Sequence, residues 1–297
     1  MGRVQLIVNP AARGGRSAEA EALAAFVAVG REVVVHRTLA AGDAARITTS
    51  LVAELAPAGS DALFVLGGDG TVMEAVGALV GRKVAVGILP GGTGNQLAGH
   101  LRIPRRVAAA VRALSTPRLA LLDLGRLASG RYFAITAGLG LDASMIALTT
   151  TASKRRFGVG SYVLGAARAL GSQHPFTVRV EADGVVVERE ARLAMIANVG
   201  DVMSGRFAFG PGVRPDDGLL DICVFSPSGL AEGIALAARF ARRDFRPDPR
   251  MLFVRGKEVR VSTDARVSAQ ADGELLDCTD LAATVVPAGA LFLIPSR

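Results

Sequence analysis

Short apolar runs alternate with segments of helical pattern in the first third of the chain. The apolar runs are Val4 to Val8, Val33 to His36, Ala62 to Leu66 and Val84 to Ile88. Each has the length of a strand, and a continuous apolar run predicts a strand that is buried on both faces. The segments around them favour helices over about residues 17–29, 43–55, 71–80 and 104–114. This alternation predicts a parallel sheet with helices on both faces, that is, a three-layer α/β domain.

Closely spaced strand-like runs replace this alternation from Leu119 onward. They cover residues 119–124, 132–136, 177–182, 185–190, 193–198 and 220–225. Asp183-Gly184, between two of these runs, is typical of a two-residue hairpin turn. Helical insertions are expected around residues 159–170 and 230–242. We therefore expect a second, mainly antiparallel β domain, and we place the boundary near Leu122.

A glycine-rich loop follows the third predicted strand directly. Its sequence is Gly67-Gly68-Asp69-Gly70-Thr71. Glycines let the backbone approach a ligand closely, and the amides that begin a helix favour a phosphate group. Asp69 would repel a bare phosphate, so it indicates either a Mg²⁺ ion between carboxylate and phosphates or a hydroxyl group that it orients. Thr71 and Glu74 have the spacing of a capping box, which predicts that the next helix begins there.

A second glycine-rich loop follows the fourth predicted strand. It reads Pro90-Gly91-Gly92-Thr93-Gly94-Asn95, and Thr93 with Gln96 has the spacing of another capping box. Ligands in such sheets bind beyond the carboxyl ends of the strands, so Asn9, Thr38 and Asp69 should lie near this loop. One such loop can be an ordinary tight turn. The pair predicts a nucleotide site, although neither loop matches the P-loop or the dinucleotide-binding fingerprint.

Size, composition and charge narrow the class of protein. The chain has 297 residues, half of them apolar, and a net charge of +7. Charged residues interrupt every apolar run before it reaches the length of a membrane span, and the N-terminus lacks a signal-peptide pattern. We therefore expect a soluble cytoplasmic protein. Cys223 and Cys278 lack metal-ligand spacing and are expected to be reduced thiols.

Two basic clusters each have two interpretations. The first is Lys154-Arg155-Arg156, and the second consists of Arg239, Arg242, Arg243 and Arg246. Either cluster could lie against anionic lipid headgroups, and a solvated helix face is the alternative. Basic groups without interleaved aromatic residues or a binding motif give no indication of nucleic acid as a partner. The sequence leaves a homodimer open.

Two acidic turns in the second domain are candidate sites. Pro215-Asp216-Asp217-Gly218-Leu219 could hold a hard cation through carboxylate and carbonyl oxygens, or it could be an ordinary Asp-Gly turn. Gln270-Ala271-Asp272-Gly273-Glu274 is either a hairpin turn or the location of a general base. In the second case Glu274 or Asp272 would take a proton from a substrate hydroxyl.

The motifs taken together resemble one known family. In chain order they are Asn9-Pro10, Gly67 to Thr71 with Glu74, Gly92 to Asn95, Asp123-Leu124-Gly125, Asp217 to Asp221, and Asp272-Gly273-Glu274. Over nearly the whole chain they are similar to the bacterial diacylglycerol kinase-like lipid kinases. That family shares a catalytic domain with sphingosine kinases and, more distantly, with NAD kinase and 6-phosphofructokinase. The resemblance implies a nucleotide domain over residues 1–122, a lipid-substrate domain over 123–287, and a last strand over 288–297 that returns to the first domain.

The resemblance also implies the chemistry. The chain would use ATP and Mg²⁺ to transfer the γ-phosphoryl group to a lipid hydroxyl in the cleft between the domains, with peripheral contact at the inner face of the membrane. Glu274 would be the proton acceptor and Asp69 would act on Mg²⁺-ATP. A structural Mg²⁺ would be held by Asp217 and by the carbonyls of Arg214 and Leu219. The residues implied around the nucleotide are Asn9, Pro10, Ala11, Ala12, Arg13, Thr38, Gly67, Gly68, Asp69, Gly70, Thr71, Val72, Met73, Glu74, Gly92, Thr93, Gly94 and Asn95.

Three positions depart from the family pattern. Gln96 stands where Asp is common, Ala12 stands where Ser is usual, and Arg13 precedes the glycines of the first loop. Two alternatives stay open: a kinase of a soluble hydroxyl acceptor, and a non-catalytic nucleotide or lipid sensor. No motif encodes the acceptor lipid. The apolar segments 145–148 and 159–170 are either part of its pocket or ordinary core.

Overall fold

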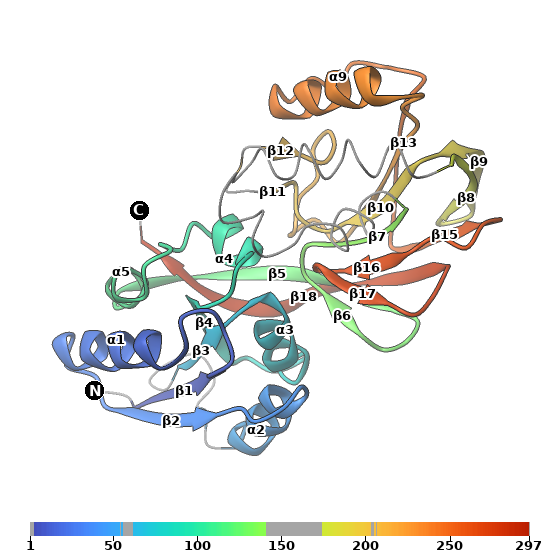
Figure 1. The fold of residues 1–297 in the computed structure, drawn as a ribbon. Helices are drawn as coiled ribbons and strands as arrows, with labels where there is room; N and C mark the ends of the chain where they lie inside the picture. The colour runs from blue at the N-terminus through green and yellow to red at the C-terminus, as the bar shows by residue number, and fades with distance from the viewer. Residues whose placement is uncertain are drawn as a thin grey trace. The chain divides into compact units, whose positions relative to one another are not determined.

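A computed structural model gives the fold of the chain (Figure 1). It describes residues 3–53, 55, 62–140, 174–202, 205 and 207–296. The segments expected at 145–148 and 159–170, and the basic cluster at 154–156, lie outside these ranges. Contacts along the chain divide it into two compact units. One is formed mainly by Met1–Leu124 and Pro287–Arg297, and the other mainly by Gly125–Val202 and Arg206–Val286.

The sheet of the first unit is parallel. Its strands are β1 (Val4–Val8), β2 (Val33–Arg37), β3 (Leu63–Gly67) and β4 (Ala85–Pro90), in the order β2-β1-β3-β4. The end of β18 (Leu281–Pro295) extends this sheet beside β4, also in parallel. Every residue of β1, β3 and β4 is buried, which explains why these runs are almost entirely apolar.

Helices cover both faces of this sheet (Figure 1). They are α1 (Gly15–Ala28), α2 (Asp43–Leu51), α3 (Asp69–Gly77), α4 (Gln96–His100) and α5 (Val107–Ala113). Right-handed crossovers place α1 on one face and α2 and α3 on the other. In agreement with this, α1 packs against α5 and α2 packs against α3. The predicted three-layer α/β domain is confirmed.

The second unit is built from antiparallel strands. One sheet has the order β14-β13-β10-β7-β16-β17, and β18, β15, β8 and β9 pair in that order in another. The bounds are β5 (Pro117–Leu127), β6 (Tyr132–Phe133), β7 (Thr136–Gly140), β8 (Phe176–Ala182), β9 (Val185–Ala191), β10 (Leu193–Ala197), β11 (Asp201–Val202), β12 (Phe207–Ala208), β13 (Leu220–Phe225), α9 (Leu230–Ala241), β14 (Met251–Gly256), β15 (Glu258–Thr263), β16 (Ala269–Ala271) and β17 (Glu274–Leu276). The predicted mainly antiparallel β domain is confirmed.

The turn between β8 and β9 is the two-residue hairpin expected from Asp183-Gly184. Ala182 pairs with Val185 across it, and φ is +45° at Asp183 and +87° at Gly184. Positive φ at both central residues is the signature of the type I′ turn, for which Asp-Gly is favoured. The local sequence therefore determines this turn correctly.

Helix α1 begins earlier than the sequence predicts. It starts at Gly15, and its N-cap Gly14 makes no side-chain hydrogen bond, so the expected start at Ser17 is wrong by two residues.

The cysteines and the helices agree with the sequence analysis. Both cysteines are free thiols, as predicted, with Cys223 buried and Cys278 exposed. No helix in the described part of the chain is long and apolar enough to cross a membrane.

Candidate functional site

The carboxyl ends of the parallel strands bring the predicted loops to one edge of the first unit. Val8 pairs with Leu66, and Gly67 pairs with Pro90, so β1, β3 and β4 end side by side. Thr38 follows β2 and is buried, and its amide donates to the carbonyl of Val8 at 2.9 Å. The structure therefore gathers the loops after all four strands at one edge.

The two glycine loops contact each other through their backbones. The amides of Gly91 and Gly92 donate to the carbonyl of Gly67 at 2.9 Å and 3.1 Å. A Cβ atom on Gly92 would lie 2.5 Å from the Cα of Gly68, a distance that side chains do not tolerate. Gly92 is thus required for the contact between the loops. The sequence interpretation had explained the glycines of these loops by the close approach of a ligand.

Asp69 connects the two loops. Its carboxylate accepts hydrogen bonds from the amides of Gln96 at 3.1 Å and Leu97 at 3.2 Å, which begin helix α4. Burial raises the pKa of Asp69, and the backbone amides that it binds act in the opposite direction. The predicted capping box of Thr93 and Gln96 is therefore wrong, because Asp69 caps this helix from the neighbouring loop.

The N-cap of α4 is Asn95, which binds within its own loop. Its φ is +49°, in the left-handed region. Its side-chain oxygen accepts from the amide of Gly92 at 2.9 Å, and its side-chain amide donates to the carbonyl of Gly92 at 2.7 Å. Asn95 therefore closes the second glycine loop into a compact turn.

The loop after β1 contacts helix α3. The side-chain amide of Asn9 donates to the hydroxyl of Thr71 at 2.9 Å, and the Asn9 side-chain oxygen accepts from the amide of Ala11 at 3.0 Å. Thr71 lies inside α3, whose N-cap Gly68 makes no side-chain hydrogen bond, so the first predicted capping box is also wrong. Asn9 and Thr71 instead link the loop after β1 to the loop after β3.

The remaining residues implied around the nucleotide lie on α3 and in the exposed part of the first loop. Glu74 accepts from the amide of Ala44 at 3.2 Å, so its carboxylate caps helix α2. The side chains of Val72 and Met73 belong to the core, with 1% and 8% of their surface exposed. Only their backbone could meet a ligand. Ala11, Arg13 and Thr93 are exposed.

The second unit holds the candidate general bases. The Asp272 carboxylate accepts from the amides of Ala134, Ile135 and Thr136 at 2.7, 2.8 and 3.0 Å. Glu274 is 53% exposed, and its carboxylate pairs with Arg131 at 2.5 Å. Asp272 is thus committed to holding the backbone before β7, and Glu274 is the more accessible of the two carboxylates.

The turn at Asp217 contains carboxylate and carbonyl oxygens, the ligands that a hard cation prefers. One Asp217 oxygen accepts from the amide of Leu219 at 3.2 Å, and the other lies 3.8 Å from Arg255. Asp221 also pairs with Arg255, at 2.8 Å, and its second oxygen is buried with no hydrogen-bond partner. Burial raises the pKa of Asp221, and the charge of Asp217 raises it further. An unsatisfied carboxylate oxygen beside a second carboxylate fits a divalent cation.

This fit depends on backbone oxygens. The described residues contain no group of three or more His, Cys, Asp or Glu side chains that could hold a metal ion. The Arg214 guanidinium is committed to Asp216, at 3.0 Å, so Arg214 could contribute only its carbonyl oxygen.

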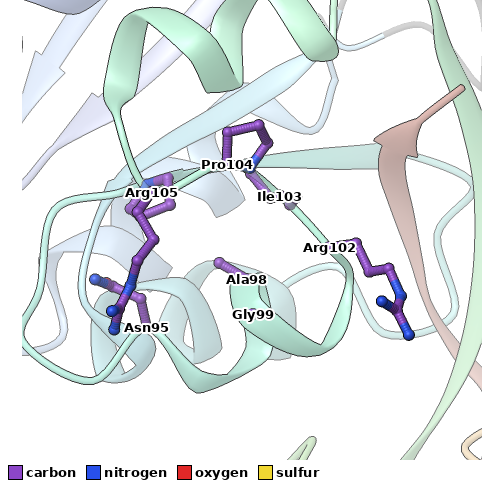
Figure 2. A pocket seen from close by; sticks show the side chains of 8 residues that line it. Asn95, Ala98, Gly99, Arg102, Ile103, Pro104 and Arg105 are labelled. Atoms are coloured by element: carbon purple, nitrogen blue, oxygen red, sulfur yellow. The ribbon is translucent and has the colours of Figure 1, made fainter. Parts of the chain in front are cut away.

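A cavity of about 260 Å³ lies in the first unit beside the second glycine loop (Figure 2). It is lined by Pro90, Asn95, Ala98, Gly99, Arg102, Ile103, Pro104 and Arg105. Pro90 and Asn95 belong to the second glycine-rich loop, and the sequence interpretation included none of the other lining residues in the site. The sequence feature that could have indicated this cavity is the pair of arginines on either side of Ile103-Pro104, shortly after helix α4.

Comparisons with known proteins identify the family of the chain. Residues 3–127 match the family described as the diacylglycerol kinase catalytic domain, and residues 135–294 match the YegS C-terminal NAD kinase beta sandwich-like domain. These matches define the chain as a kinase whose phosphoryl acceptor is a hydroxyl group. It belongs to the bacterial diacylglycerol kinase-like lipid kinase family.

Individual relatives extend over almost the whole chain. The diacylglycerol kinase of Bacillus subtilis is 28% identical over 92% of this chain and 90% of its own length. The diacylglycerol kinase of Staphylococcus carnosus is 26% identical over 86% of this chain and 82% of its own. A crystal structure of a Bacillus anthracis protein described as a diacylglycerol kinase superimposes on this chain with a TM-score of 0.80 at 26% identity. The superposition covers 98% of this chain and 95% of that protein.

Proposed function

We propose that the chain transfers the γ-phosphoryl group of ATP to the hydroxyl group of a lipid, with Mg²⁺ as the accompanying cation. The observation that supports this most is the contact between the two glycine loops at the ends of β3 and β4. Ligands of parallel sheets bind beyond the carboxyl ends of the strands, and glycines there let the phosphates of a nucleotide approach the backbone closely. The names of the relatives support a lipid acceptor, because both curated kinases quoted above are diacylglycerol kinases.

The side chains of the first unit hold the nucleotide loops in this proposal. Asp69 fixes the second loop against the first through the amides of Gln96 and Leu97. Asn9 adds the loop after β1 through Thr71. Phosphoryl transfer depends on positioning and on stabilising charge more than on covalent chemistry with the protein. A rigid frame of three loops is what that chemistry needs.

Glu274 accepts the proton of the lipid hydroxyl. As the hydroxyl oxygen forms its bond to the γ-phosphorus, the bond between that phosphorus and the oxygen of ADP breaks, and the proton passes to the Glu274 carboxylate. Arg131 positions this carboxylate through their ion pair. Mg²⁺ would be held by Asp217 and the carbonyls of Arg214 and Leu219, where its charge would order this turn.

The direct test is transfer of radiolabelled γ-phosphate from ATP, in the presence of Mg²⁺, to a panel of acceptors. The panel contains diacylglycerol, sphingoid bases, ceramide, a total lipid extract and soluble polyols. We expect label in a product that is extracted into organic solvent, and the acceptor that yields it identifies the lipid. Label only in a water-soluble product would replace this proposal by a soluble-acceptor kinase. ATP binding without transfer would favour a sensor.

Helix α9 is the surface that we propose for contact with the membrane. Leu230 and Ile234 on this helix are 49% and 52% exposed. Exposed Arg242 follows the helix and carries the charge that anionic headgroups attract. The other three arginines of the expected basic cluster pair with carboxylates: Arg239 with Asp248 and Asp244, Arg243 with Asp201, and Arg246 with Asp244.

A further inference from the structure

The turn that leads into Glu274 is a tight hairpin. Asp272 and Gly273 connect β16 to β17, and Ala271 pairs with Glu274 across them. φ is +47° at Asp272 and +86° at Gly273, the pattern of a type I′ turn. In the sheet, β16 also pairs with β7 (Figure 1). Asp272 therefore lies in a two-residue turn that ends at the proposed general base.

Three successive backbone amides converge on the Asp272 carboxylate. They belong to Ala134, Ile135 and Thr136, which lead into β7. Successive N–H groups that point to one place form a concavity that binds an anion. In the other direction, the amide of Asp272 donates to the carbonyl of Thr136 at 2.8 Å. Hydrogen bonds in both directions therefore join the turn to residues 134–136.

The segment that Asp272 binds is itself fixed in the core of the second unit. Ala134, Ile135 and Thr136 are buried. The side-chain amide of Asn198 donates to the carbonyl of Ala134 at 2.8 Å, and the backbone amide of Asn198 donates to the carbonyl of Ile135 at 2.9 Å. Because the segment is buried and bonded from both sides, it gives the turn a rigid attachment.

The same part of the chain also holds the Glu274 side chain. Arg131 lies in the turn between β5 and β6, shortly before Ala134, and its carbonyl accepts from the amide of Leu127 at 2.8 Å. Its guanidinium pairs with the Glu274 carboxylate. Residues 131–136 thus contact the hairpin at two points. Arg131 holds the carboxylate, and the bonds to Asp272 hold the backbone that carries it.

A second hairpin in this unit has the same construction without a candidate base. The turn between β8 and β9 is the type I′ turn at Asp183-Gly184 described above. The Asp183 carboxylate accepts from the amides of Lys257 at 2.8 Å and Glu258 at 2.9 Å. The residue after this turn is Val185, which can take no proton. Comparison of the two hairpins therefore separates stabilisation of a turn from positioning of a base.

We propose that Asp272 is a positioning residue for phosphoryl transfer, which fixes the backbone of Glu274 so that its carboxylate reaches the hydroxyl of the acceptor. The inference rests on the proposed function, since it assumes that Glu274 takes the proton. A general base acts only within hydrogen-bond reach of that proton. A displacement of about 1 Å can cost about 100-fold in rate. An exposed carboxylate on a hairpin therefore depends on what holds the hairpin.

The test is Asp272→Asn, measured by steady-state transfer to the acceptor lipid. Asparagine keeps the shape of the side chain but places an NH₂ group where an oxygen accepts from a backbone amide. We expect kcat to fall about ten-fold, with KM for ATP unchanged. Asp183→Asn is the matched control. It should lower the melting temperature, as Asp272→Asn does, and leave kcat unchanged. Equal loss of kcat in both variants would overturn the positioning role.

A double variant distinguishes positioning from a general loss of structure. Asp272→Asn combined with Glu274→Gln should have the kcat of Glu274→Gln alone, because no base is left to position. A further ten-fold loss in the double variant would overturn the inference and leave the proposed kinase untouched. Transfer that Glu274→Gln does not slow would instead overturn the proposed base.

A pair of glycine substitutions repeats the comparison if Asp272→Asn does not fold. Gly273 and Gly184 occupy the same position of the two turns, with φ of +86° and +87°, and nothing lies within 4 Å of the Cβ that either would carry. Gly273→Ala and Gly184→Ala therefore strain the two turns alike. Gly273→Ala should lower kcat, whereas Gly184→Ala should not. The same kcat in both variants would contradict a positioning role of the turn at Asp272.

Discussion

The carboxylates of Asp69 and Glu274 differ in burial and in hydrogen-bond partners, so substitutions at the two positions have different structural effects. Asp69 is partly buried and bound by the amides of α4, so its replacement would disturb the loops as well as the chemistry. Glu274 is half exposed, and its carboxylate pairs with Arg131. Exposed ion pairs contribute about 0–1 kcal/mol to stability. Glu274 therefore allows function to be separated from folding.

Glu274→Gln should lower kcat at least about 100-fold, the usual contribution of a general base. ATP affinity and melting temperature should stay close to those of the unchanged chain. Steady-state transfer kinetics and an ATP titration measure these quantities. Arg131→Gln is the control, because it breaks the same ion pair but keeps the carboxylate, and it should cost much less. Equal losses in the two variants would show that only the ion pair matters.

At the scale of elements, the glycine loops act as one structure. The Gly92 Cα faces the Gly68 Cα so closely that no side chain fits between them. Gly92→Ala should separate the loops, destabilise the protein by about 1–3 kcal/mol and weaken ATP binding about ten-fold or more. Thermal unfolding and ATP titration provide the measurements.

Gly229→Ala is the matched control for this substitution. Gly229 precedes α9 with φ of −171°, and nothing lies within 4 Å of the position that its Cβ would take. It should leave both quantities unchanged. If Gly92→Ala bound ATP normally, the contact between the loops would not belong to the nucleotide site.

Elements whose signal is local were predictable from the sequence, and those that depend on distant partners were not. The buried strands and the hairpin at Asp183-Gly184 are written in consecutive residues, and the structure contains them. Both predicted capping boxes are wrong. The amides that begin α4 are bound by Asp69, 27 positions earlier in the chain, and Thr71 lies inside α3, where its hydroxyl accepts from Asn9. The left-handed backbone of Arg102 could not have been predicted either, because it follows from the way in which α4 ends.

For the whole molecule, the net charge of +7 gives a general attraction to anionic membranes, whereas α9 would give a specific one. Ile234→Ser and Arg242→Gln should each reduce the fraction bound to anionic vesicles, with Arg242→Gln costing about 1 kcal/mol, or roughly five-fold. Co-sedimentation with vesicles measures this fraction. Arg112→Gln on α5 is the control, because it removes the same charge from another exposed helix. Equal losses in Arg112→Gln and Arg242→Gln would leave only a general effect of charge.

The place of β18 in the first unit has a consequence for synthesis of the protein. Leu291 and Phe292 pair with Ala85 and Val86, so β4 finds its neighbour about 200 positions later in the chain. At translation rates of about 5–20 residues per second, β4 stays open for on the order of ten seconds or more. An open edge of a buried strand invites pairing with other chains. The nascent first unit therefore needs protection of the exposed edge of β4 on the ribosome until the second unit has been synthesised. A chain that ended before residue 287 would carry its nucleotide loops on a sheet that lacks the strand beside β4.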